Sequence, residues 1–449
     1  MVKEIKAATF YSILADEVTS HNREDLAFCI RFVDQNKDIR EEFLSFLRVP
    51  RITGEVIAST MIQFLQDVNL DLKNIRGQGY DGAANISSDN VGVQRKIKNE
   101  SPKAVYVHCS GQCLNLVIAH SCSLPNTRNI IAKLKNCCLF FLTSPKRESL
   151  LQSIVMKALP DISKPRKGLI DLCRSRYSSR HDSYRHFYQA YCYVIIALEY
   201  IAYCANKDSC GEDFTNVTWD TTSRDNANSL LTSLMSFDFI ISFLTMYQFL
   251  SHLEGITVKL QGRTEDIIMA YHEIAEVKSV YKDILRNMDE EFSRVYTQAE
   301  RMACSVNTEP TKARIVGRQI MRNNAPAINP EEYYRRNFAI PFLNHISSEL
   351  ESQFSDLSIL FSKLLGLVPS TLCEEGGASL QNVVKFYAED LPSADLFPSA
   401  SIKRMRRRVI PKHFHSSKNL LFNPSDHSAS AANVVLVHCA GSIHIGEQV

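Results

Sequence analysis

The start of the chain carries three successive stretches in which apolar and polar residues alternate, or in which β-branched and aromatic residues cluster. They are residues 9–18, 25–33 and 42–49. Short runs of this kind, bounded by polar joins, are typical of β-strands. Because the joins are short, we expect the three strands to form an antiparallel meander.

The apolar spacing changes to three and four residues after Thr53, a residue type that caps helices, and this predicts a helix to about Val68. A strand leading to Asp81, a helix at 91–98 and a strand at 104–109 follow. The order β-β-β-α-β-α-β is typical of ribonuclease H-like folds, in which the first and fourth strands lie side by side. On this assignment Asp16 and Asp81 lie on adjacent strands.

Nearly everything from residue 114 to 368 has helical spacing. A run at 178–203 is rich in aromatic residues, and a run at 229–253 is almost wholly apolar. Residues 264–302 place apolar side chains at three- and four-residue steps, which predicts one long amphipathic helix, and a final helix is expected at 331–361. The fold class is therefore α/β, a ribonuclease H-like mixed sheet interrupted by a large all-α insertion.

The predicted organisation has four parts. The core with five strands covers residues 1–118, and the helical insertion covers 119–370. Residues 371–398 begin a C-terminal segment that is expected to be truncated. Residues 399–449, where the sequence turns basic and then rich in Ser, Asn and His, are expected to be a poorly ordered tail.

Composition adds little to this organisation. The formal net charge of +2 gives no global footprint for nucleic acid, so any such binding must come from local patches. Thirteen irregularly spaced cysteines and the absence of a signal-peptide pattern favour a reduced, intracellular protein. The apolar run near 230–253 contains Asp238, Gln248 and His252, which favours a buried helix over a membrane span.

Asp16 and Asp81 are the residues that suggest chemistry. Two-metal nucleases and transposases hold two divalent ions with hard oxygen ligands, usually three carboxylates, and the ions activate water or a 3′-hydroxyl against a phosphate. The alternative is that both residues are turn caps, Asp16 before Thr19 and Asp81 before Ile86. Residue spacing alone leaves both interpretations open.

The chain resembles the hAT superfamily of DNA transposases, including domesticated relatives among the repressors of the inhibitor of the protein kinase and the zinc finger MYM-type proteins. Six stretches carry the resemblance, in this order: Tyr-Ser-Ile-Leu-Ala-Asp-Glu-Val-Thr (11–19), Arg-Gly-Gln-Gly-Tyr-Asp-Gly-Ala-Ala-Asn (76–85), His-Cys-Ser-Gly-Gln-Cys-Leu-Asn-Leu (108–116), Ser-Arg-Tyr-Ser-Ser-Arg-His (175–181), Glu-Glu-Tyr-Tyr-Arg-Arg (331–336) and Glu-Asp-Leu-Pro-Ser (389–393). Each stretch is weak alone, but their order is specific.

The resemblance implies that Asp16 and Asp81 are the first two catalytic acids and metal ligands, with Mg²⁺ or Mn²⁺ as cofactor. The family's third acid is a glutamate in a C-terminal segment that closes the core, and we find no counterpart of it here. Two further positions depart from the family. Gln112 stands where the family has the histidine of Cys-x-x-His, and Tyr177 stands where it has tryptophan.

Basic residues near the start of the insertion, where the family would contact DNA ends, include Arg174, Arg176 and Arg180, and we assign these with Tyr177 as DNA-binding residues. A solvated basic surface is the equal alternative. The run at 403–408 is a nuclear localisation signal, a phosphate-binding tail or a solvated run. His108, Cys109, Cys113, His120 and Cys122 fit no zinc spacing, so buried thiols and core histidines are favoured.

These observations favour a transposase-derived protein whose catalytic core is incomplete and not competent in strand transfer. We expect it to act by binding DNA or protein in the nucleus, with the cytoplasm as the alternative location. A second hypothesis is a regulatory interaction module, in which the apolar stripe at 267–302 binds a protein partner or a second copy. A third is a truncated product of a longer transposase-like gene. No membrane association is expected.

Overall fold

The computed structural model describes residues 1–20, 23–36, 38–80, 92–108, 110–158, 177–214, 217–260, 267–314, 324–355 and 389–390. The chain divides into two compact units. The first comprises Met1–Leu114, Val258–Glu276 and Glu351–Val449, and the second comprises Asn115–Thr257 and Val277–Leu350. The chain thus leaves the first unit and returns to it twice.

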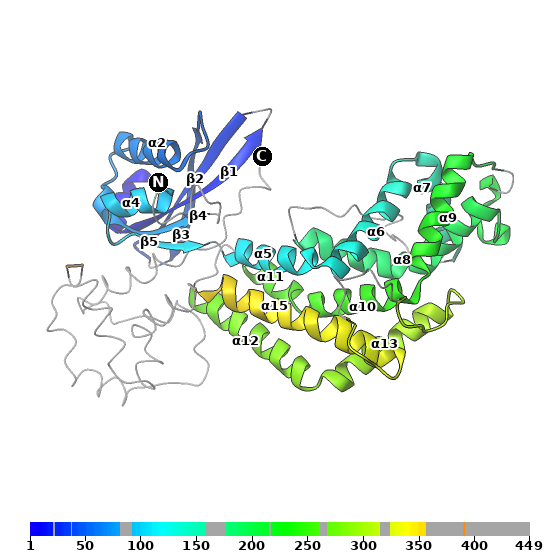
Figure 1. Ribbon diagram of the computed structural model, residues 1–449. Coiled ribbons are helices and arrows are strands. Elements are labelled where there is room, and N and C mark those ends of the chain that lie inside the picture. The colour runs from blue at the N-terminus through cyan, green and yellow to red at the C-terminus, as the bar shows by residue number, and fades with distance from the viewer. Residues whose placement is uncertain are drawn as a thin grey trace. The chain divides into compact units, whose positions relative to one another are not determined.

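The described part of the first unit contains a five-stranded mixed sheet (Figure 1). The strand order is β3-β2-β1-β4-β5, with β1 antiparallel to β2 and parallel to β4. The fold class and the central pairing of the first and fourth strands are therefore confirmed. The strands are β1 (Tyr11–Ser20), β2 (Arg23–Val33), β3 (Ile39–Arg48), β4 (Ile75–Tyr80) and β5 (Val105–His108).

Helices α2 (Gly54–Asp67) and α4 (Val93–Glu100) pack their apolar residues against one face of this sheet. Thr53 accepts a hydrogen bond from the backbone N–H of Val56, so the predicted cap is confirmed. Ile57, Met61 and Leu65 of α2 are fully buried there. A short helix α1 (Val2–Ala8), which the sequence pattern did not indicate, contributes Ile5 to the same core, and η1 (Leu72–Asn74) leads into β4.

A β-bulge in β3 places two aromatic residues on the other face of the sheet. Phe28 pairs with Ser45 and Cys29 pairs with Phe43, so Leu44 is an extra residue in the ladder. Residues three apart in a regular strand point to opposite faces, but the bulge brings Phe43 and Phe46 to the same face. Their ring centroids are 4.9 Å apart, and both residues are more than 40% exposed, at 43% and 42%.

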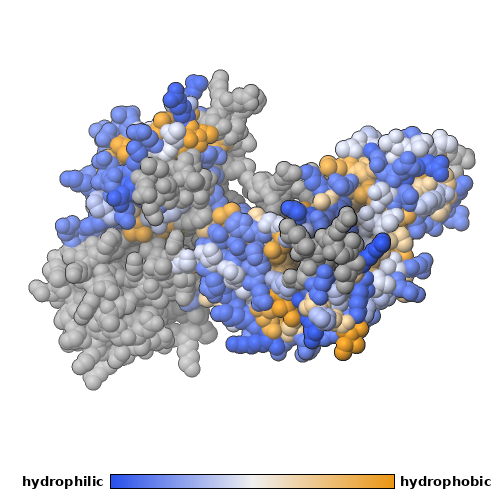
Figure 2. Space-filling view, viewed as in Figure 1, coloured by the Kyte–Doolittle hydropathy of each residue, from blue (hydrophilic) through white to orange (hydrophobic). Residues whose placement is uncertain are grey.

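The secondary-structure elements described after β5 are all helices, as predicted (Figure 1). In the view of Figure 2, hydrophilic residues cover most of the visible surface of these helices, with apolar residues in small groups. The elements are α5 (Ser110–Ser123), α6 (Pro125–Leu142), α7 (Pro145–Ala158), α8 (Tyr177–Tyr203), η2 (Lys207–Ser209), η3 (Glu212–Phe214), α9 (Thr221–Leu234), α10 (Phe237–Ser251), α11 (Glu254–Leu260), α12 (Ile267–Arg286), α13 (Met288–Cys304), α14 (Pro330–Tyr334), η4 (Arg335–Ala339) and α15 (Ile340–Gln353).

Two predicted helices are each broken into two. The run at 229–253 divides between α9 and α10, because Ser236 accepts a hydrogen bond from the backbone N–H of Phe239 and starts a new helix. The run at 264–302 divides at Asn287, and α13 begins there with three acidic residues in its first turn. Acidic side chains stabilise a helix N-terminus, so the pattern of charge held a signal that the apolar spacing did not.

Helix α10 forms the centre of the helical unit. It packs against α6, α8, α9 and α13, and most of its side chains are buried. Phe239 and Phe243 stack in parallel, with their ring centroids 5.9 Å apart, and Phe187 of α8 contacts both edge-on. Across the described residues, no single helix has the length and apolarity to cross a membrane, although α9 and α10, bent by 68°, meet those criteria as a pair.

The two faces of the sheet should differ in their sensitivity to mutation. Phe28 is fully buried and packs edge-on against Phe64 of α2. We expect Phe28→Ala to destabilise the first unit by about 3–5 kcal/mol, because it leaves a cavity. Phe46→Ala on the exposed face should cost clearly less. Hydrogen exchange of the β1 and β2 amides would measure both, and equal loss of protection would contradict this assignment of faces.

Candidate functional site

Asp16 lies within β1, on the face of the sheet opposite to α2 and α4. Tyr11, Ile13 and Ala15 belong to the core beneath those helices, so the alternating residues Ser12, Leu14 and Asp16 point to the other face. Asp16 pairs with Ala27, which pairs in turn with Phe46. Since β1 continues to Ser20, Asp16 is a strand residue, and the interpretation that it caps a turn before Thr19 is wrong.

The second predicted acid, Asp81, lies outside the described residues, immediately after the last residue of β4. The register between the two parallel strands pairs Ile13 with Gln78 and Leu14 with Gly79. Asp16 is two residues beyond Leu14, and position 81 is two residues beyond Gly79. The two positions are therefore equally distant in sequence from the last described pair of this ladder.

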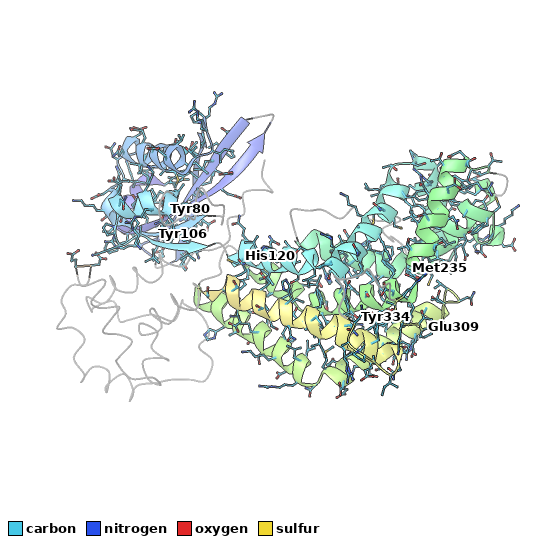
Figure 3. All side chains as sticks on the ribbon, viewed as in Figure 1. Tyr80, Tyr106, His120, Met235, Glu309 and Tyr334 are labelled. Carbon is cyan, nitrogen blue, oxygen red and sulfur yellow. The ribbon has the colours of Figure 1, made fainter. Side chains whose placement is uncertain are left out.

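The end of β4 is anchored in the core. Gln78 donates hydrogen bonds to the backbone carbonyls of Gln94 and Ala104, at 3.1 Å each. Tyr80 is fully buried, and its ring stacks on that of Tyr106 of β5, with centroids 6.2 Å apart (Figure 3). Burial raises the pKa of the Tyr80 hydroxyl well above its usual value. These contacts fix the strand up to the residue before position 81.

Asp25 is an acid near Asp16 that the sequence reasoning missed. It lies on β2 opposite Val18, so it is the diagonal neighbour of Asp16 on the same face, roughly 7 Å away. Only the strand register reveals this proximity. Asp25 also lies directly opposite Arg48 of β3, a cation that can balance its charge. Glu17, next in the sequence to Asp16, points to the opposite face.

A two-metal site needs about three carboxylates that share two ions. The strand register gives Asp16 and Asp25 on one face, which is too few hard ligands for that cage. No group of three His, Cys, Asp or Glu side chains in the described ranges is arranged to hold a metal ion. The described donor set therefore does not by itself fit two Mg²⁺ or Mn²⁺ ions.

A second irregularity redirects Arg76 at the other end of β4. Tyr11 pairs with Ile75 and Ser12 pairs with Gly77, so Arg76 is an extra residue in the ladder. Its guanidinium carbon lies 4.2 Å from the centroid of the Phe10 ring, and Nη1 donates to the carbonyl of Lys73 at 2.6 Å. Its Nε and Nη2 donate to the carboxylate of Asp390 at 2.8 and 2.7 Å.

Asp390 thus returns to the core 314 residues after Arg76. Lys103 Nζ lies 3.0 Å from Asp390 and 3.0 Å from Glu389, and the Arg76 and Asp390 side chains are only 4% and 6% exposed. Burial alone would raise the pKa of Asp390, but hydrogen bonds and charge from Arg76 and Lys103 outweigh it and hold that pKa below its usual value. The carboxylate is an ionised, fully engaged group.

The location of Asp390 separates it from the candidate acids. Arg76 is the second residue of β4 and Tyr80 is the last. A strand rises about 3.3 Å per residue, so roughly 13 Å separate the Arg76 end from the Tyr80 end. Asp390 therefore joins the core at the start of β4, whereas position 81 follows the end of that strand.

The predicted DNA-binding residues lie at the start of α8. Arg174 and Arg176 fall outside the described residues, and Tyr177 and Arg180 are in the first turns of α8, where only the backbone is described.

His181 follows them in α8 and is buried, with Nε2 2.8 Å from Glu254 and its ring stacked on Tyr247 at 5.4 Å. Arg185 pairs with both Glu254 and Asp182. Burial lowers the pKa of His181 more than Glu254 raises it. The neutral ring therefore donates its Nε2 proton to Glu254.

Three of the residues that could suggest zinc, Cys113, His120 and Cys122, lie on α5, and those described are not arranged to hold a metal ion. Cys113 and Cys122 are buried. His120 is an exposed residue of α5 (Figure 3), and its Nδ1 lies 2.6 Å from Glu349 Oε2, so the expectation of a core histidine is wrong for this residue. The side chain of His108, all of Cys109 and the basic run at 403–408 lie outside the described part of the chain.

Comparison with known proteins agrees with the sheet. Residues 1–92 match the model of the family described as DUF4371, ZMYM1/FAM200, RNase-like domain. The chain is 26% identical over 399 residues to the 52 kDa repressor of the inhibitor of the protein kinase from Homo sapiens, and 25% identical over 396 residues to the protein of that name from Mus musculus. Each match covers 88% of this chain and 51% of the relative, so the chain spans about half of their length. The predicted relationship to hAT-derived proteins is confirmed.

The contact between Arg76 and Asp390 should be essential to the first unit. Asp390→Ala leaves the buried guanidinium without its carboxylate, and we expect a loss of about 3–5 kcal/mol. Glu389→Ala is the matched control, because that side chain is 87% exposed and should change stability little. Urea unfolding, monitored by hydrogen exchange of the β4 and β5 amides, measures the loss of stability in both variants. Equal stability of the two variants would contradict this assignment.

The same contact predicts a dependence on pH. Because the pKa of Asp390 is lowered in the folded chain, its contribution to stability is complete above about pH 3.8 and is lost as the pH falls through the lower folded value.

The helical unit should lose stability in mild acid through His181. Its folded pKa lies below the usual 6.5, so the unfolded chain takes up a proton at a higher pH than the folded chain. Stability should therefore fall as the pH is lowered from about 6.5 towards the folded pKa of His181. His181→Gln should flatten the dependence in thermal unfolding between pH 5 and 7, and an unchanged slope would contradict the assignment.

Proposed function

We propose that this chain, a relative of hAT transposase-derived proteins, is a DNA-binding factor whose ribonuclease H-like core does not catalyse strand transfer. The observation that carries the proposal is the engagement of Asp390. It is an acid of the last family-like stretch that returns to the core, and it is neutralised by Arg76 and Lys103 instead of joining Asp16. A carboxylate with all its charge compensated in this way is a poor ligand for a metal ion.

The candidate acids give a second line of support. Asp16 and Asp25 make a small anionic patch on neighbouring strands, and no third carboxylate of the described residues completes it. Such a patch binds one divalent ion weakly and does not hold two in the geometry that phosphoryl transfer needs.

The DNA-binding part of the proposal rests on the relationship and on the basic residues at the start of the helical insertion. Arg174, Arg176 and Arg180 would contact phosphates, and Tyr177 would stack on a base. The relatives are named as repressors, which favours a regulatory role and a location in the nucleus. Metal is not required for contacts of this kind.

The alternative is a protein-interaction module built on the apolar stripe of α12 and α13. Tyr281 and Phe292, two large residues of that stripe, are fully buried, and the Tyr281 hydroxyl donates to the carbonyl of Phe249 at 2.7 Å. Since these side chains are used in the core of the helical unit, a protein partner or a second copy would bind a different face. This favours the DNA-binding proposal.

A cleavage and binding assay tests the proposal. The purified chain with Mg²⁺ or Mn²⁺ and labelled DNA should show no cleavage above that of Asp16→Ala, because the cage is incomplete. Gel-shift affinity for the same DNA should persist when EDTA removes divalent ions.

Glu17→Gln is the matched control, since this neighbouring acid points to the other face, and Asp25→Asn tests the remaining acid. Metal-dependent cleavage that Asp16→Ala abolishes and Glu17→Gln retains would overturn the proposal. Loss of cleavage in Asp25→Asn would then assign the missing ligand.

A further inference from the structure

An open cavity of about 620 Å³ lies between α8 and α13 in the helical unit. Helix α8 contributes Tyr188 and Cys192 to its wall, and α13 contributes Arg294, Thr297 and Arg301. None of the described residues that line it is acidic. The volume is within the range of sites for small ligands, which is about 300–1,000 Å³. The lining residues therefore offer hydrogen-bond donors and positive charge, and none of those described is itself a carboxylate.

The wall is already organised in the free protein. The ring of Tyr188 stacks on Tyr247, with centroids 5.6 Å apart, and its hydroxyl oxygen accepts a hydrogen bond from Gln298 Nε2 at 2.5 Å. Gln298 is itself held by Gln248 of α10. Because the oxygen of Tyr188 accepts from Gln298, its proton remains to be donated to a ligand.

The two arginines play different parts. They are seven residues apart on α13, so they lie on the same face, separated by about 10 Å along the helix axis. Arg294 is held by Glu290 at 2.6 Å and by Glu291 at 3.1 Å, which compensates its charge. Arg301 is exposed, and no carboxylate of the described residues lies within ion-pairing distance of it. Arg301 is therefore the available cation of the cavity.

We propose that this cavity binds a phosphate group, and that the phosphate belongs to a nucleic-acid backbone. A guanidinium binds phosphate oxygens through paired hydrogen bonds, and the hydroxyls of Thr297, one turn before Arg301, and of Tyr188 on the facing helix add donors from other directions. A tetrahedral oxyanion uses donors that converge from several sides, whereas a planar carboxylate uses fewer. The choice of nucleic acid over a free phosphate compound rests on the proposed function.

Binding of a fluorescein-labelled DNA duplex, measured by anisotropy in a salt series, tests the proposal. Arg301→Ala should weaken binding about tenfold, the size of a lost hydrogen bond to a charged group. It should also reduce the slope of log affinity against log salt by about one, because one phosphate contact is lost. Arg301→Lys keeps the charge and should retain the salt slope, and Thr297→Val should weaken binding by a smaller factor.

Arg286→Ala is the matched control. Arg286 is an exposed helical arginine outside the cavity, paired only with Asp283 at 3.0 Å among the described residues, and its loss should leave affinity unchanged. Circular dichroism confirms that each variant is folded. If the native chain binds DNA and Arg301→Ala behaves as Arg286→Ala does, the cavity proposal is overturned while the proposed function stands.

Titration calorimetry with inorganic phosphate separates the two sources of the group. If Arg301→Ala loses binding of inorganic phosphate but keeps its affinity for DNA, the cavity takes a free phosphate compound and the nucleic-acid assignment is wrong. If the native chain binds inorganic phosphate through Arg301 but no DNA, the proposed function fails together with that assignment. A parallel loss of both ligands in Arg301→Ala supports the proposal.

Discussion

The parallel pairing of β1 with β4 is the constraint on which the first unit depends. It brings residues that are more than sixty positions apart in the sequence into one ladder at the centre of the sheet. The other neighbour of β1 is β2, and the other neighbour of β4 is β5. The register also decides which face each side chain occupies. Ile13 and Gln78 point into the core beneath α2 and α4, and Asp16 points away from it. A slip of one residue would bury the carboxylate and expose the core, so the apolar alternation fixes the location of the acid.

Two irregularities in otherwise regular ladders carry much of the local chemistry. The extra residue in β3 brings Phe43 and Phe46 to one face, and the extra residue in β4 turns Arg76 out of the ladder towards Phe10 and Asp390. Bulges of this kind re-aim side chains at small cost to pairing. At Arg76 the result is a buried ion pair with a second cation, Lys103, beside it. The desolvation of two charges is offset only because nearly every donor and acceptor is satisfied.

The same contact joins two segments of the first unit that are far apart in the sequence. Arg76 belongs to the first pass through the core and Asp390 to the last, and the whole helical unit lies between them in sequence. Closing so long a loop costs conformational entropy, which rises only slowly with loop length. A bidentate, buried pair is strong enough to hold such a return. Asp390, an acid of the last family-like stretch, is therefore committed to holding the fold together.

Much of the architecture follows from local patterns in the sequence. The alternation at 9–18, 25–33 and 42–49 determined the hairpins, Thr53 determined the start of α2, and the order of elements determined that the first and fourth strands are neighbours. These features depend on residues close in sequence, whose periodicity states which face is buried. Even the break at Asn287 had a local signal in the acids that follow it.

Only the tertiary structure decided the rest. Four features join residues that lie between 9 and 314 positions apart in the sequence. They are the bulge at Arg76, its pairing with Asp390, the diagonal relation of Asp25 to Asp16, and the hydrogen bond between Tyr188 and Gln298. Contacts of this kind are selected by packing and charge in three dimensions, and no periodicity along the chain records them.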